Sequence, residues 1–167
     1  MIEYARLIGQ PRFSEGYIRA RKIEVMEREI QRESYALRYR RVLEALMRNP
    51  SRLEDVAKVA ASAAACELDI DTPAIRAMDQ SEIHEDPHKL GYAPMRKENL
   101  IVIRMDQCPC AIARIAAHET RHRWQIDGGR FLDMLGAGTS ESDAEEFASR
   151  FAKKYLSSNC SGCGKAY

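Results

Sequence analysis

The chain has 167 residues, with 26 basic and 25 acidic side chains and a formal net charge of +1 at pH 7. This length allows one domain with a full hydrophobic core, and the balanced charge excludes bulk attraction to nucleic acid or to an anionic membrane as the basis of function. The N-terminus lacks a basic and apolar leader, and no stretch is apolar for long enough to cross a bilayer, so we expect a cytoplasmic protein that does not enter membranes.

The N-terminal region predicts two helices. Apolar residues recur at near-helical spacing over residues 14–47, and the basic and acidic residues between them favour a solvated face with ion pairs one turn apart over a nucleic-acid surface. Pro50 separates this helix from the next one. Ser51, followed three residues later by Glu54, matches a capping box and predicts a second helix over residues 51–66.

Residues 67–98 contain three prolines and predict irregular structure, apart from a short strand at residues 74–78. This segment also contains His84 and His88. Because Pro87 lies between them, the two histidines cannot share one face of a helix at adjacent turns. We therefore expect them to be exposed loop histidines rather than metal ligands.

A strand and two helices are predicted after this segment. The β-branched run at residues 99–105 predicts a strand. The small apolar residues that follow lead into a helix over residues 110–126. Ser140 opens a final helix that reaches residue 156, with acidic residues in its first turns and lysines near its end, as the helix dipole favours.

Residues 118–122 form an H-E-x-x-H pattern, which is the strongest chemical signal in the chain. On a helix, His118 and His122 lie one turn apart on one face and can bind a single Zn²⁺. Glu119 then lies beside the metal, where it can take a proton from water. The apolar residues before the pattern indicate a helix buried in a core, so the sequence predicts a zinc hydrolase and most often a peptidase.

A catalytic zinc ion needs a third protein ligand and an open position for water. Glu141 and Glu145, at the start of the final helix, lie one turn apart on the same face. One of these carboxylates can bind the metal while the other accepts the outer N–H of a ligand histidine and fixes the orientation of its ring.

The two motifs together resemble the gluzincins, the thermolysin-like superfamily. The closest likeness is to compact intracellular zincins in which H-E-x-x-H is followed by an E-x-E-A-N-x-F-A or E-x-x-A-D segment, which residues 141–148 match at the first glutamate, the second acid, the alanine and the Phe-Ala pair. The resemblance covers roughly residues 99–156 and implies that Glu141 is the third zinc ligand. It departs at Glu145, where those families have Asn or Asp, and this places the orienting role of Glu145 in doubt.

The resemblance also implies a fold. We expect an α+β, zincin-like core over residues 67–167, in which a small mixed sheet packs on the H-E-x-x-H helix and on the following helix with its glutamates. Residues 1–66 form a helical region that packs on or extends this core. The metzincin continuation is excluded, because it would need glycine at Gln125 and histidine at Gly128.

The predicted reaction is zinc-dependent hydrolysis of peptide bonds in a protein or peptide substrate, with a metal-activated water and Glu119 as general base. As the resemblance implies, the strand at residues 99–105 is expected to hold an extended substrate at a sheet edge. The reaction also needs a donor for the developing oxyanion. The residues that could supply this donor, among which the sequence does not choose, are Tyr92, His84, His88 and Arg123.

The cysteines offer ligands for a second metal site. Beside Cys66, the chain has two close pairs, Cys108 with Cys110 and Cys160 with Cys163. Four thiolates suffice for a tetrahedral structural zinc site that would tie the C-terminal tail to the start of the motif helix. Free thiols in a frayed tail and disulfide pairing are the alternatives.

Two other functions stay open. A zinc-stabilised regulatory or binding module would use the same ligands without turnover, although a purely structural site has no need for the base Glu119. A nucleic-acid-associated protein would use the basic residues within 14–47 together with the cysteine pair near the C-terminus.

Overall fold

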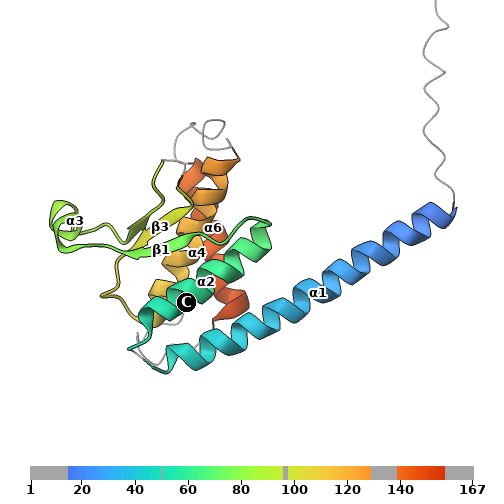
Figure 1. Ribbon diagram of the computed structural model, residues 1–167, viewed down its shortest axis with the longest axis horizontal. Coiled ribbons are helices and arrows are strands. Elements are labelled where there is room, and N and C mark those ends of the chain that lie inside the picture. Colours follow the sequence, from blue (N-terminus) through green and yellow to red (C-terminus); the bar gives the residue numbers. More distant parts are fainter. Residues whose placement is uncertain (1–14, 50, 96–97, 129–138, 157–167) are drawn as a thin grey trace, which may run out of the picture. The chain divides into compact units, whose positions relative to one another are not determined.

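The computed structural model describes residues 15–49, 51–95, 98–128 and 139–156 (Figure 1). In the described residues, the protein is a mostly helical α+β structure with a three-stranded sheet, which confirms the α+β part of the predicted fold class. The chain divides into two compact units, Met1–Ser34 and Tyr35–Tyr167, whereas the sequence placed a boundary at residue 66. In the ranges described, no helix combines the length and the apolar character that crossing a membrane requires.

Most helices lie where the sequence patterns predict them. The described helices are α1 (Glu15–Met47), α2 (Leu53–Leu68), α3 (Gln80–Glu85), α4 (Pro109–Asp127) and α6 (Thr139–Tyr155). The predicted capping box of α2 is wrong: Arg52 is the N-cap, and no side chain bonds to the free N–H groups of the helix. Instead, the backbone N–H and the hydroxyl of Ser51 donate to the side-chain oxygen of Asn49, which holds Ser51 in a local turn.

The sheet is mixed, as predicted. Its strands are β1 (Ala74–Ala77), β2 (Gly91–Tyr92) and β3 (Leu100–Ile103), in the order β1-β3-β2. Strand β3 pairs parallel with β1 and antiparallel with β2, so both of its edges are occupied. The expectation that this strand adds a substrate strand is therefore wrong, and the sheet edge formed by β2 is the one that borders α4.

Residues 67–98 are more ordered than the sequence predicted, because they contain both α3 and β2. Asp79 and Glu82 form a reciprocal capping box at the start of α3. The guanidinium of Arg76 donates to both carboxylate oxygens of Glu82 and to the hydroxyl of Tyr92. These bonds connect β1, α3 and β2. Apolar periodicity in the sequence does not indicate this helix, because α3 has no buried residue.

Helix α4 lies at the centre of the fold and packs against α2, α6, β2 and β3 (Figure 1). Its contact with α2 is built from small residues that are fully buried, which allows the two backbones to approach closely. These residues are Ala57, Ala60, Ala61 and Ala64 of α2 and Ala113, Ala116 and Ala117 of α4. Strand β3 and aromatic residues of α6 complete the same core. The H-E-x-x-H motif is therefore on a helix that is held from several sides.

Candidate metal centre

Helices α4 and α6 bring His118, His122 and Glu141 together. One ligand atom from each of these residues lies within 4.8 Å of the other two. The Nε2 atoms of the histidines are 3.0 Å apart, and each lies 3.1 Å from an oxygen of Glu141. In the described parts of the chain, this is the group of His, Cys, Asp and Glu side chains with the geometry to hold a metal ion.

The donor set fits zinc in kind and in spacing. Two imidazole nitrogens and a carboxylate oxygen are common ligands of Zn²⁺, and metal–ligand distances near 2.0–2.1 Å in a tetrahedron require ligand atoms about 3.3 Å apart. The separations of 3.0 and 3.1 Å lie within a few tenths of an ångström of this value. Electron-pair donors that converge so closely repel one another unless a proton or a metal cation lies between them.

A buried hydrogen-bond chain orients His122. Gln125 is fully buried, and its amide N–H₂ donates to Asp143 at 2.7 Å and to the carbonyl of Ser140 at 3.1 Å. Its carbonyl oxygen therefore faces Nδ1 of His122, at 2.8 Å, and accepts the proton of that nitrogen. With Nδ1 protonated, Nε2 of His122 presents its lone pair to the metal position.

Asp143, the end of this chain, is itself fixed by Arg121. The guanidinium donates to both carboxylate oxygens, at 2.7 and 2.9 Å, and it stacks 3.8 Å from the ring centre of Trp124. The Arg121 bonds hold the pKa of Asp143 below its ordinary value. The sequence analysis missed Gln125, Asp143 and Arg121 as site residues. The one sequence signal for this hydrogen-bond chain was Gln125, an amide residue three positions after His122 on the same face of the helix.

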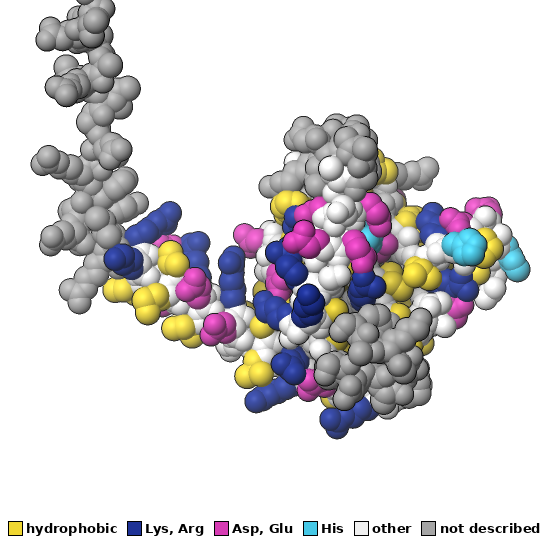
Figure 2. Space-filling view, turned by 180° about the vertical axis from the view of Figure 1, so that it is seen from behind, with side chains coloured by type: hydrophobic (Ala, Val, Ile, Leu, Met, Phe, Trp, Pro, Cys, Tyr) yellow, Lys and Arg dark blue, Asp and Glu magenta, His cyan; other side chains and the backbone are white. Residues whose placement is uncertain are grey.

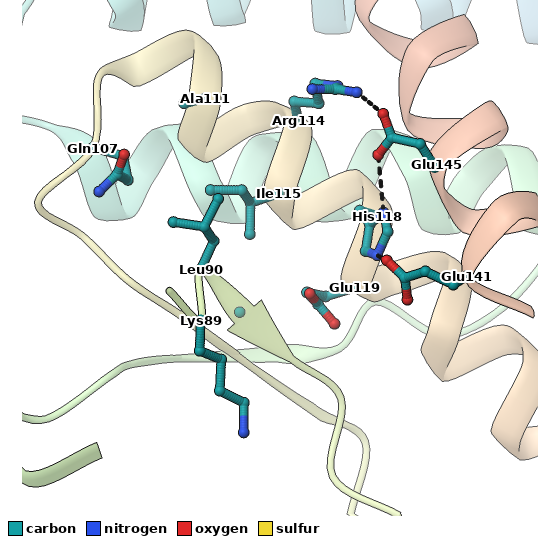
Figure 3. Close-up of a pocket in the computed structure, with 11 residues that line it drawn as sticks. Lys89, Leu90, Gln107, Ala111, Arg114, Ile115, His118, Glu119, Glu141 and Glu145 are labelled. Atoms are coloured by element: carbon teal, nitrogen blue, oxygen red, sulfur yellow. Dashed lines mark hydrogen bonds and ion pairs between the residues drawn. The ribbon is translucent and has the colours of Figure 1, made fainter. Parts of the chain in front are cut away.

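His118 has a different partner. Its Nδ1 lies 3.6 Å from Glu145, which also forms an ion pair with Arg114 (Figure 3). Glu145 thus lies where an orienting carboxylate was expected, although the same carboxylate is also paired with Arg114. Burial, and then the neighbouring His122, lower the pKa of His118, which favours the neutral, metal-binding form.

Glu119 lies beside the ligands but is not one of them. The residue is 6 % exposed, and a Cβ added at Gly91 of β2 would lie only 3.0 Å from its carboxyl. Glycine therefore lets the edge strand pass close to this acid. Burial, and then the charge of Glu141, raise the pKa of Glu119 to about 8, whereas Lys89 opposes the shift. With this pKa the carboxyl is mostly protonated at neutral pH, and a cation bound beside it would lower the pKa and favour the carboxylate that a general base requires.

Two clefts meet at these residues. One has a volume of about 450 Å³, and the other, on the side of Tyr92 and Ile126, has about 390 Å³. Both are lined by Gly91, Glu119 and the potential ligands His118 and Glu141, and Figure 3 shows the first of the two. An extended chain that occupied both clefts would therefore pass directly over the metal position and the base.

The structure separates the residues that were considered as oxyanion donors. Arg123 is 1 % exposed and donates to the carbonyls of Pro94 and Glu98, so it holds a loop. The hydroxyl of Tyr92 is bonded to Glu82 and Arg76, although the residue lines the second cleft. His84 and His88 are exposed, as predicted, but His84 lies in the last turn of α3 and not in a loop. In this structure, none of these four residues directs a free hydrogen-bond donor at the metal position.

Only two of the four cysteines in the second predicted metal site are among the described residues. Cys108 and Cys110 are disulfide-bonded, at the N-cap and the first turn of α4, while Cys160 and Cys163 lie outside the described residues. Cys66 is an exposed free thiol. Because zinc is bound by thiolates and not by disulfide sulfurs, the state of Cys108 and Cys110 disagrees with the predicted four-cysteine zinc site and agrees with the disulfide alternative for these two residues.

Comparison with known proteins adds no assignment: no family model, no curated protein and no solved structure matches the chain. Function must be argued from the site alone.

Proposed function

We propose that the protein is a zinc metallopeptidase of the gluzincin type, with a zincin-like core. One observation carries the proposal: His118, His122 and Glu141 converge to within 4.8 Å while the buried carboxyl of Glu119 lies beside them in an open cleft. A structural zinc site is normally closed by four protein ligands. Three ligands, a neighbouring base and an open side are the arrangement of a hydrolytic site.

In this mechanism, His118, His122 and Glu141 hold the metal. Zinc supplies Lewis acidity, which polarises the substrate carbonyl and makes water more acidic. Glu119 accepts the proton of the attacking water and passes it to the amine that leaves. Its buried environment raises its pKa, and the charge of a bound metal would counter this shift and favour the carboxylate form that accepts the proton. Gln125 keeps His122 in the tautomer that binds metal through Nε2.

The substrate is proposed to be an extended peptide segment. The two clefts leave both sides of the metal position open, so the site has room for residues before and after the bond that is cut. This arrangement favours cleavage within a chain over removal of a terminal residue. Among the described strands, β2 is at the edge of the sheet beside the site, where its backbone groups would be available to a peptide.

The proposal is tested by incubating the zinc-loaded full chain with a library of unstructured peptides and identifying new termini by mass spectrometry. Glu119→Gln should keep the bound zinc and slow cleavage about a thousandfold, because it removes the general base. The matched control is Glu146→Gln, the same change at an exposed residue of α6, and it should cleave at the normal rate. Cleavage that is unchanged in Glu119→Gln would refute the mechanism. Zinc binding without cleavage by the wild type would favour a regulatory or binding module.

A further inference from the structure

Helix α1 carries apolar side chains on two opposite sides. Tyr39, Leu43 and Leu46 belong to the hydrophobic core or pack against it. A second row consists of four large apolar side chains that are between 50 % and 64 % exposed, namely Ile23, Met26, Ile30 and Leu37. Figure 2 shows hydrophobic side chains on the surface of this helix between charged ones. Single exposed apolar residues are ordinary, but a continuous row on one helix is typical of a contact surface.

The spacing of the row is that of a coiled-coil seam. The residues follow one another at intervals of three, four and seven, so they fall within an arc of about 60° on the helix. In heptad terms, Ile23, Ile30 and Leu37 occupy a positions and Met26 occupies a d position. Two isoleucines at a positions favour a pair of parallel helices over larger bundles.

The charges beside the seam are complementary to those of a second, identical helix. Lys22 precedes the seam at a g position and Glu27 follows it at an e position, so in a parallel, in-register pair Lys22 of one helix faces Glu27 of the other. Within the described part of α1, neither residue forms an ion pair with its own chain. On the far side of the helix, Glu24 forms ion pairs with both Arg21 and Arg28.

We propose that α1 is a homodimerisation surface, in which two copies of the chain associate in parallel through the row from Ile23 to Leu37. Glu33 occupies the remaining d position, where the two carboxylates of a dimer would meet. This repulsion weakens the pair without altering its register. The proposal does not depend on the metal site or on peptidase activity.

The test is sedimentation of the full chain over about a hundredfold range of concentration, since self-association follows mass action. The wild type should reach a dimer, and Ile30→Glu should lose it. The matched control is Val25→Glu, which places the same charge at a β-branched residue that is 49 % exposed on the other side of α1, and it should still dimerise. A wild type that stays monomeric, or a larger oligomer, would overturn the proposal. Equal loss of the dimer in both variants would also overturn it.

Two further variants test the register. Lys22→Glu should weaken the dimer by placing like charges opposite each other, and adding Glu27→Lys should restore it, because the pair is then reversed rather than lost. Replacing Glu33 with leucine should tighten the dimer by completing the seam. Failure of the double variant to restore association would contradict the parallel arrangement. Circular dichroism of each variant checks that α1 remains helical.

Discussion

Helix α4 has two sides that are built on different physical rules. Towards α2, it presents alanines whose only role is to allow close packing. Towards α6, it presents histidines, an arginine and a glutamine, each with a specific polar partner. The packing side determines where the helix lies, and the polar side uses that position to hold ligand atoms about 3 Å apart. Substitutions on the two sides should therefore have different consequences.

The largest expected effect on metal binding, apart from removal of a ligand, comes from the polar side. Gln125→Leu removes the acceptor for the N–H of His122 and leaves Asp143 without one of its donors. We expect zinc affinity to fall by up to about a hundredfold, as is typical when a partner of a ligand histidine is lost. Competition with a fluorescent chelator measures this change.

Thr120→Val is the control for Gln125→Leu. Thr120 is fully buried on the same helix, and its hydroxyl bonds only to the carbonyl of Ala116. Both variants remove a buried polar group, but only the first contacts a ligand histidine. If Thr120→Val weakened zinc binding as much as Gln125→Leu, the effect would come from general destabilisation of α4 and not from orientation of His122.

On the packing side, Ala60→Leu should act on folding instead. Ala60 is fully buried in the core between α2 and α4, and a larger side chain there forces the helices apart. We expect the free energy of unfolding to fall by about 2 kcal/mol, as measured by chemical denaturation. The zinc affinity of the folded protein should change by less than a factor of about two, since the site lies on the other side of α4. A large loss of affinity would show that the two sides are coupled.

The smallest effect is expected at the partner of the other histidine. Glu145 is 51 % exposed, lies 3.6 Å from His118 and is shared with Arg114, so its interaction is screened by solvent. Glu145→Gln should lower zinc affinity by less than about fivefold. Glu146→Gln controls for the loss of one charge from the same helix. If Glu145→Gln lowered zinc affinity more than Gln125→Leu does, the partner of His118 would matter more than the partner of His122, contrary to this account.

The sequence predicted the residues of α4 whose position follows from local helical geometry. It did not predict the residues whose role depends on partners that are distant in the sequence. The positions of His118 and His122 follow from helical geometry alone, and Glu141 was found because its family resemblance implied a ligand. Gln125 was not identified, since its role requires Asp143, which a tertiary contact brings to it. Periodicity shows that a residue faces inward, but it does not show what lies opposite.

The same limit explains the errors in the fold. The capping box predicted at Ser51 was wrong because the helix has Arg52 as its N-cap, one residue later. The capping box formed by Asp79 and Glu82 lay in a segment without apolar periodicity. Strand β3 was recognised from its β-branched residues, but its central position depends on strands β1 and β2, which no local pattern pairs with it.

The central claim is that His118, His122 and Glu141 bind one metal ion. Its most direct test is the zinc content of the wild-type chain and of the double variant His118→Ala and His122→Ala, measured by elemental analysis after dialysis against metal-free buffer. We predict that the variant contains one zinc ion fewer per chain, whether or not the cysteines hold another. Equal zinc content in the two proteins, or a wild type that retains none, would contradict the account.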